Sequence, residues 1–142
     1  MYRLKQFFFE ESEYTFFHEL LSALPPEQYR VFPKVRMEDY ILATGGYKIR
    51  FADRQRIKSR HVDFMIWQRN PGHFVMGIEL DGTSHNNGKA RKTDAFKDQV
   101  FKSVGLPLIR VKVGTDFTEE IQAILQRLNI AQTPTESPSL LS

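Results

Sequence analysis

Two acidic residues stand inside apolar runs of this sequence. Asp63 lies within His61–Trp67 (HVDFMIW), and Glu79 lies within Phe74–Asp81 (FVMGIELD). Runs this rich in β-branched and aromatic residues are typical of strands that are buried on both faces. An ionised carboxylate in such a strand loses much of its hydration energy unless a cation compensates it. We therefore expect Asp63 and Glu79 to have a cationic partner.

The segment between the two runs predicts how close these acids lie. Gln68–His73 contains an Asn-Pro-Gly turn signal, which joins the runs as a hairpin. A hairpin that is symmetric about Pro71 places Asp63 opposite Glu79, with Cβ atoms about 4.5 to 5.5 Å apart. Two carboxylates at that separation can share a divalent ion. The alternative is that each acid is solvated at a strand end or paired with an arginine.

Two further residues after the second run could take part in the same chemistry. Asp81 shares a strand face with Glu79, because side chains alternate along a strand. His85 follows in the polar loop Gly82–Gly88, and an imidazole titrates near neutral pH, so it can act as a general base or acid. Alternatively, His85 is a loop residue that only forms a hydrogen bond with Asp81.

The rest of the chain predicts the elements that position these residues. Helical spacing begins at Ser12, the expected N-cap, and ends before Pro25, with Glu13 in the first turn. A short helix is expected over Met37–Leu42. The other expected helices are Lys89–Val104 and Thr115–Asn129, and the other expected strands are Tyr29–Arg36 and Leu106–Val113. This order, α-β-β-β-α-β-α, predicts an α/β fold with a mixed central sheet flanked by helices, in which the last two strands are parallel.

Composition limits the class of protein. With 142 residues and 41% hydrophobic content, we expect one domain over residues 1–130 and a disordered Ser/Thr/Pro tail over 131–142. The chain has no cysteine, so metal ligands must be oxygen or imidazole, which fits a reducing cytoplasm. No apolar run approaches the roughly 20 residues that span a bilayer, so no membrane partner is expected.

The charge is concentrated in the middle of the chain, where residues 30–69 hold ten basic and four acidic residues. In Tyr47–Arg60, basic residues fall at every second position from Arg54, the spacing that lines one face of a strand. Such a stripe can lie along a phosphate backbone. A charged edge strand or an ordinary solvated surface would look the same. The residues predicted to contact nucleic acid are Lys34, Arg56, Lys58, Arg60 and Lys92.

These segments together resemble a known superfamily. The acid of the second strand and the Ile-Glu-Leu of the third resemble the PD-(D/E)XK, or restriction-endonuclease-like, superfamily. Over residues 12–113 the chain is similar to an uncharacterised bacterial domain family related to very-short-patch-repair nucleases. The segments that carry the resemblance are VFPKV (31–35), HVDF (61–64), IELD (78–81), Ser84-His85 and GLPLIR (105–110).

The resemblance implies a restriction-endonuclease-like core and metal-dependent hydrolysis of a phosphodiester, most simply by a DNA endonuclease or nicking nuclease. Asp63, Glu79 and the backbone carbonyl of Leu80 would hold Mg²⁺ or Mn²⁺, and Glu13 matches an acid that leans into such sites. Mg²⁺ can activate a water and neutralise charge on the phosphate. Cleavage of both strands would suggest a homodimer, and a tether to another DNA-processing module is equally compatible with the resemblance.

The chain departs from this family at Asp81, where a lysine is usual. Lys34 and Lys92 are the expected sources of a replacement lysine, and His85 is the expected alternative base. A second hypothesis is a nuclease fold that has lost its chemistry and binds nucleic acid or a protein partner. A third is a metal-dependent hydrolase of a small phosphate ester.

Overall fold

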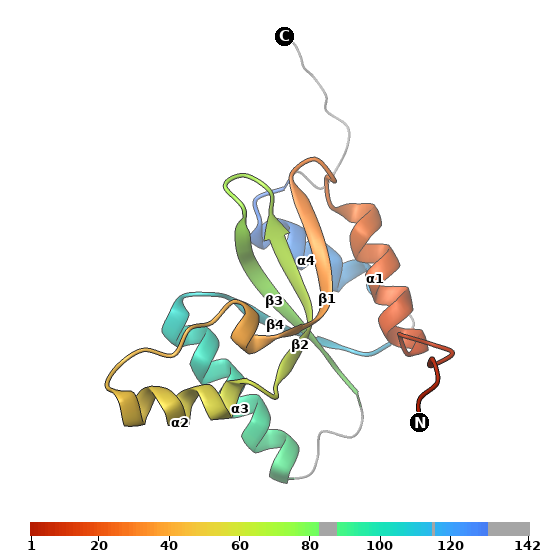
Figure 1. Cartoon of the computed structure of the whole chain (residues 1–142). Helices are drawn as coiled ribbons and strands as arrows, with labels where there is room; N and C mark the ends of the chain where they lie inside the picture. The colour runs from red at the N-terminus through yellow and green to blue at the C-terminus, as the bar shows by residue number, and fades with distance from the viewer. Residues whose placement is uncertain (83–87, 115, 131–142) are drawn as a thin grey trace. The chain divides into compact units, whose positions relative to one another are not determined.

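The computed structural model describes residues 1–82, 88–114 and 116–130 (Figure 1). They form two compact units: Pro26–Val113 is one, and Met1–Pro25 with the chain that begins at Gly114 is the other. The predicted loop position His85 and the predicted tail over 131–142 lie outside the described residues. The single domain over residues 1–130 stays a prediction.

The unit Pro26–Val113 is built on a four-stranded sheet in the order β1-β2-β3-β4. The strands are β1 (Tyr29–Arg36), β2 (His61–Gln68), β3 (His73–Asp81) and β4 (Leu108–Lys112). The first three are antiparallel neighbours, whereas β4 runs parallel to β3. The predicted α/β class with a mixed sheet and a parallel last pair is therefore confirmed.

The β2–β3 hairpin has the predicted register at its inner end. Phe64 faces Ile78, as symmetry about Pro71 requires, and an irregularity between Ile66 and Trp67 shifts the pairing nearer the turn. Residues 64–66 and 76–80 are buried without interruption. Both strands therefore read as near-continuous apolar runs because both of their faces are buried.

Short helical elements pack on the sheet within this unit. They are η1 (Met37–Asp39), α2 (Tyr47–Ile57) and α3 (Gly88–Val104). The expected helix over residues 37–42 is thus only a single 3₁₀ turn, whereas the expected helix over 89–104 is confirmed. One core cluster joins these elements to β2, with buried members Met37, Ile41, Ile57, Val62, Met65 and Phe101.

The predicted strand stripe over 47–60 is wrong, because residues 47–57 form the helix α2. Consecutive helical residues are turned by about 100°, so Arg54 and Arg56 point to different sides of α2 rather than along one face. The segment is rich in Lys, Arg, Gln and Ala, which favour helices. Basic residues at every second position were a weaker indication than helix propensity, because apolar residues do not alternate with them.

The second unit contains α1 (Glu11–Ala23) and α4 (Thr118–Arg127), whose buried rings Phe16 and Phe117 meet edge to face with centroids 5.2 Å apart. The N-cap of α1 is Glu10 rather than Ser12. Reciprocal bonds satisfy the helix start, since the Glu10 N–H donates to Glu13 Oε1 at 2.9 Å. Ser12 therefore lies inside the helix.

None of the helices in the described part of the chain is both long and apolar enough to cross a membrane.

Candidate active site

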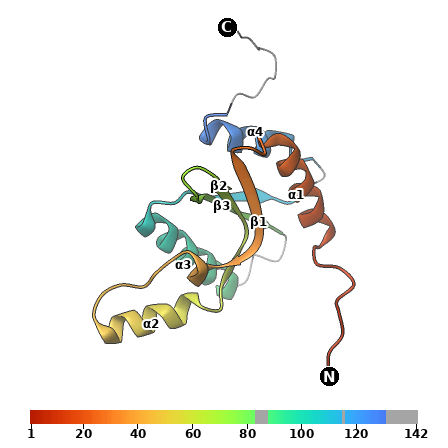
Figure 2. The same cartoon turned by 45° about the horizontal axis from the view of Figure 1, so that its top comes forward.

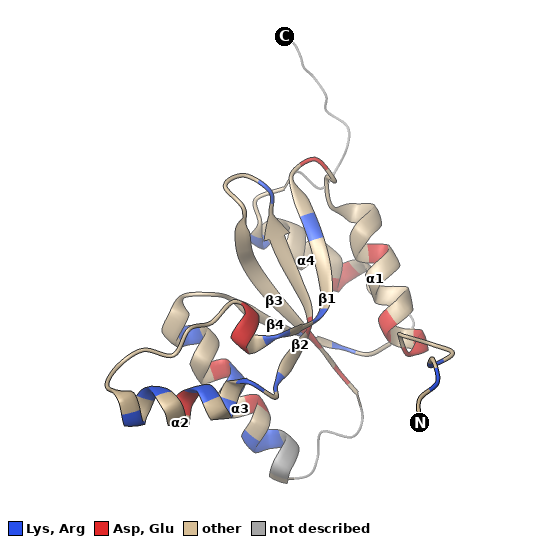
Figure 3. Cartoon of the chain, viewed as in Figure 1, with Lys and Arg blue, Asp and Glu red and all other residues tan. Residues whose placement is uncertain are grey.

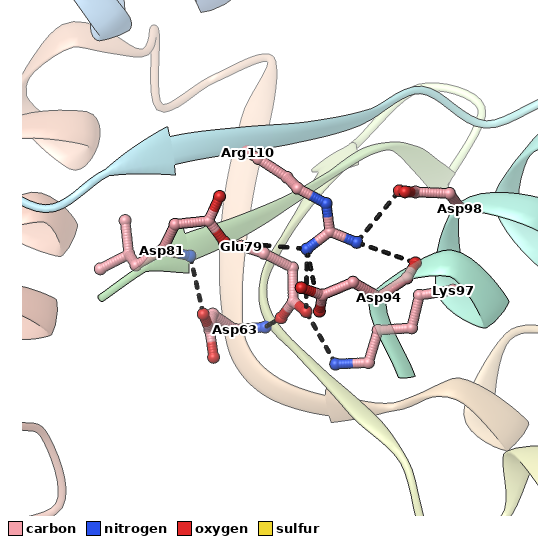
Figure 4. Close-up of polar contacts among 8 residues, drawn as sticks. Asp63, Glu79, Asp81, Asp94, Lys97, Asp98 and Arg110 are labelled. Atoms are coloured by element: carbon pink, nitrogen blue, oxygen red, sulfur yellow. Dashed lines mark hydrogen bonds and ion pairs between the residues drawn. The ribbon is translucent and has the colours of Figure 1, made fainter. Parts of the chain in front are cut away.

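The two predicted acids stand where β3 separates from β2. Backbone pairing of these strands reaches Phe64 and Ile78, while β2 stays paired with β1 to the end of both strands. Beyond that point side chains take over: the Asp63 N–H donates to Glu79 Oε2 at 3.1 Å, and the Leu80 N–H donates to Asp63 Oδ2 at 2.8 Å (Figure 4). Each carboxylate thus satisfies a backbone donor on the other strand, which fixes both acids at the base of a fork.

Glu79 is buried, and its compensating cation is Lys97 of α3. The two residues are 6% and 8% exposed, and Lys97 Nζ donates to Glu79 Oε1 at 2.7 Å. Removing either partner would leave an uncompensated buried charge, which is strongly unfavourable. The prediction that an acid in these strands needs a cationic partner is confirmed for Glu79.

A glycine in β3 allows α3 to bring Lys97 to this position. A Cβ on Gly77 would lie 2.7 Å from Phe101 Cε2, so the ring of Phe101 packs directly against the strand backbone. Glu79 is two residues beyond Gly77 and lies on the same face of β3, and Lys97 is one helical turn before Phe101. The close packing of Phe101 on Gly77 therefore places Glu79, two residues along the strand, beside Lys97, one turn along the helix.

A second cation, Arg110 of β4, stands among four carboxylates. It is the parallel-strand neighbour of Glu79, and one guanidinium nitrogen, Nη2, donates to Asp98 Oδ1 at 3.0 Å. The other, Nη1, lies 3.3 Å from Asp94, 3.8 Å from Asp81 and 3.9 Å from Glu79 (Figure 4). Burial alone would lower the pKa of Arg110, but the hydrogen bond to Asp98 and the charges of Asp98, Asp94 and Glu79 outweigh it and raise that pKa. Arg110 is a permanent internal cation.

Asp81, two residues after Glu79, faces this arginine. Its Oδ1 is buried and accepts no hydrogen bond within the described part of the chain, and the nearest cation is Arg110. The guanidinium group of Arg110 on β4 therefore compensates the negative charge of Asp81.

The carboxylates at the fork that a magnesium ion could use are those of Asp63 and Glu79. Among the residues that the structure describes, no group of three or more His, Cys, Asp or Glu side chains is placed to hold a metal. Mg²⁺ commonly uses one or two carboxylates and completes its octahedron with water and substrate oxygens. A carboxylate has about four lone-pair sites, so Asp63 and Glu79 retain acceptor capacity beside their hydrogen bonds.

Tyr40 adds a buried phenol near the same charges. Its hydroxyl forms no hydrogen bond within the described part of the chain, and its ring packs against Phe74 and Phe101 at centroid distances of 5.2 and 6.1 Å. Burial, followed by the negative charges of Glu79 and Asp39, raises the pKa of Tyr40. The phenol therefore stays neutral and is available only as a hydrogen-bond donor or acceptor.

Neither of the two lysines predicted to replace the motif lysine is the one that bonds Glu79, and their predicted role stays a prediction. Lys92 is exposed on α3, five residues from Lys97 and therefore on a different side of the helix. Lys34 lies on β1 beside Asp63 in register, since its neighbours Pro33 and Val35 pair with Phe64 and Val62, and it has a left-handed φ of 54°. The cation that bonds Glu79 is Lys97.

The predicted site roles of Glu13 and His85 stay predictions. Glu13 belongs to the other compact unit, where its side chain accepts the Glu10 N–H, so its predicted role stays a prediction. His85 lies in the segment 83–87, which is outside the described residues.

The predicted nucleic-acid residues at the end of α2 pack on α3. The guanidinium groups of Arg56 and Arg60 lie 4.5 and 4.6 Å from the centroid of the Phe96 ring, and Arg60 also donates to the Arg56 carbonyl. Lys58 is exposed as the C-cap of α2. Contact of these residues with nucleic acid stays a prediction.

Sequence reasoning missed Lys97, Arg110, Asp94 and Asp98. One signal for Lys97 was present, because it precedes Phe101 by four residues and so shares the buried side of the helix. For Arg110 the parallel register of β4 with β3 was needed, and the sequence does not give that register.

Comparison with known proteins places the chain beside relatives without an assigned role. A family model described as "Protein of unknown function (DUF2726)" matches residues 5–128. An uncharacterized protein of Haemophilus influenzae is 33% identical over 98 residues, which are 68% of this chain and 48% of that protein. The match thus spans about half the length of that relative. No solved structure matches the chain.

Proposed function

The chain belongs to the DUF2726 family, and we propose that it is a metal-dependent nuclease with a restriction-endonuclease-like core that cleaves DNA. The observation that carries the proposal is the set Asp63, Glu79 and Lys97 at the fork of β2 and β3. Two acids on neighbouring strands with a lysine bonded to the second acid match the chemistry of the PD-(D/E)XK pattern. Here the lysine comes from α3.

Each residue of the set has a distinct task in phosphodiester hydrolysis. Asp63 and Glu79 would hold Mg²⁺ or Mn²⁺, which supplies an activated water and neutralises charge on the phosphate. Lys97 has three donor protons, of which one is directed at Glu79 Oε1. The remaining protons can orient a water or contact a phosphate oxygen. Because the ammonium is fixed by a buried ion pair, it is positioned before substrate binds.

Arg110 positions the second acid rather than reacting. It lies 3.9 Å from Glu79 and is itself anchored to α3 through the Asp94 carbonyl at 3.1 Å and Asp98 at 3.0 Å. This contact ties β4, β3 and α3 together around Glu79. The arrangement keeps the carboxylate of Glu79 in one orientation, which a metal ligand requires.

The proposal is tested by incubating supercoiled plasmid and single-stranded DNA with the protein in Mg²⁺, Mn²⁺ or EDTA. We expect nicking that requires the metal and falls about 100-fold or more in Asp63→Asn and Glu79→Gln, because each loses a metal ligand. Glu27→Gln, at an exposed acid in the same unit, serves as the control and should cleave normally. Equal cleavage by Glu79→Gln at equal purity would refute the proposal.

A nuclease fold that only binds nucleic acid or a protein partner is the second candidate. It is favoured by the internal charge compensation of the site, because Lys97 and Arg110 already balance Glu79 and Asp81. This candidate predicts salt-sensitive DNA binding that is indifferent to Mg²⁺ and survives Glu79→Gln, without cleavage by any form. Metal-dependent nicking by the unmodified protein would exclude it.

A further inference from the structure

The helix α2 is unusual for a helix in a small compact unit. Ile57 is its one buried residue, and apolar side chains in its first half are exposed: Tyr47 by 75%, Ile49 by 63% and Phe51 by 55%. Exposed aromatic side chains grouped on one element indicate an interaction surface rather than a solvated face. Figure 2 shows α2 extending from the sheet.

The same helix is strongly basic. Figure 3 shows Lys and Arg spread along it, and the residues are Lys48, Arg50, Arg54, Arg56 and the C-cap Lys58, against Asp53 alone. Lys48, Arg50 and Lys58 form no ion pair with other residues that the structure describes. These cations are therefore available to an anionic partner.

Aromatic and cationic side chains of α2 meet in one cavity. Tyr47, Arg50, Phe51 and Arg54 are spaced at i, i+3, i+4 and i+7, so they share one side of the helix and line a cavity of about 430 Å³. The opposite wall comes from Ile41–Ala43. This volume falls within the ~300–1,000 Å³ that is typical of small-molecule sites.

The acids of this cavity are already neutralised. Glu38 lies 3.4 Å from Arg54, and Asp39 accepts a hydrogen bond from Arg36 at 2.8 Å. The hydrogen bond to Asp39 and the charges of Asp39 and Glu38 raise the pKa of Arg36. Because Arg36, from outside the lining, pairs with Asp39 and Arg54 pairs with Glu38, Arg50 is the lining cation that forms no ion pair with another described residue.

Aromatic faces beside unpaired cations are the chemistry that binds single-stranded nucleic acid, in which bases stack on rings while phosphates meet Lys and Arg. A duplex keeps its base faces stacked and cannot use Tyr47 or Phe51 in this way. We propose that this α2 cavity binds an unstacked base of single-stranded DNA, with Tyr47 and Phe51 contacting the base and Arg50 and Lys48 the flanking phosphates. The choice of DNA rests on the proposed nuclease function.

The test is fluorescence anisotropy with a labelled oligothymidine of about 15 nucleotides, a matched duplex and a matched RNA, all in EDTA so that nothing is cleaved. We expect single-stranded DNA to bind at least about tenfold more tightly than duplex, and Tyr47→Ala with Phe51→Ala to lose about tenfold or more in affinity. Arg50→Gln should reduce the salt dependence of binding.

Two controls make the result decisive. Tyr14→Ala removes an aromatic ring that is 55% exposed on α1 and should bind as the unmodified protein does. Phe51→Leu keeps apolar bulk but removes the ring, so reduced binding by this variant, with an unchanged melting temperature, assigns the loss to stacking. Normal binding by the Tyr47/Phe51 variant, equal affinity for duplex, or preference for RNA would each overturn the proposal. Binding in EDTA without cleavage in Mg²⁺ would support this inference while refuting the nuclease.

Discussion

Arg110 shows how much of the site depends on one side chain. It is 21% exposed and lies within 3.9 Å of carboxylate oxygens of Glu79, Asp81, Asp94 and Asp98. Four acids gathered on β3 and α3 would repel one another without it. Arg110 therefore stabilises the packing of β3, β4 and α3 and also helps to orient Glu79.

We predict that Arg110→Met lowers the free energy of unfolding by on the order of 1–2 kcal/mol, because four neighbouring carboxylates lose the cation that they share, although Glu79 keeps Lys97. The measurement is urea unfolding followed by circular dichroism. Lys112→Met is the matched control, since Lys112 is an exposed cation on the same strand, and it should change stability little. Equal midpoints for the two variants would contradict this account of Arg110.

At the residue scale the sequence predicted the acids but not their cations. The Asn-Pro-Gly turn and the two apolar runs bring Asp63 beside Glu79, because a hairpin is local and its register follows from its turn. Lys97 meets Glu79 across 18 residues and Arg110 is a neighbour through the sheet, so both contacts depend on how α3 and β4 pack. The residues next to Lys97 and Arg110 in the sequence do not show which acid each side chain will meet.

At the element scale, α3 and β3 make the site through their close approach at Gly77. The ring of Phe101 occupies the space that a side chain at Gly77 would fill, and the preceding turn of α3 carries Lys97. The helix cannot shift without moving the ammonium away from Glu79. The glycine is thus a packing requirement of the candidate centre.

We predict that Gly77→Ala destabilises the protein by roughly 1–3 kcal/mol, since the added Cβ would stand 2.7 Å from Phe101 Cε2. Cleavage should fall as well, because α3 must move. The paired variant Gly77→Ala with Phe101→Leu makes room for the methyl group and should recover part of both losses. Unfolding curves and plasmid nicking measure them, and a fully active, fully stable Gly77→Ala protein would refute the packing argument.

The strands and helices whose apolar residues are buried at a regular spacing could be predicted from the sequence. The helix α2, whose apolar residues are mostly exposed, could not. The four strands and the helices α1, α3 and α4 were expected near their observed bounds, because apolar residues recur at the strand or helix period. In the first half of α2 the apolar residues stay exposed and only Ile57 near its end is buried, so their spacing does not mark a buried face.

At the scale of the whole molecule, the distribution of charge bears on the partner rather than on the chemistry. About half of the excess of basic residues in 30–69 falls on α2, and none of the carboxylates at the fork lies on that helix. A nuclease needs both a place for the strand and a place for the metal, and the unit Pro26–Val113 contains a candidate for each. This division lets binding and cleavage be changed independently.

The most direct test of this account is the rate of metal-dependent plasmid nicking by Lys97→Met beside Lys92→Met. Both variants remove a lysine from α3, but Lys97 bonds Glu79 and Lys92 is exposed. We expect Lys97→Met to be slower by about 100-fold or more and Lys92→Met to nick at the rate of the unmodified protein. Equal rates for the two variants, both folded, would contradict a nuclease centre built from Asp63, Glu79 and Lys97.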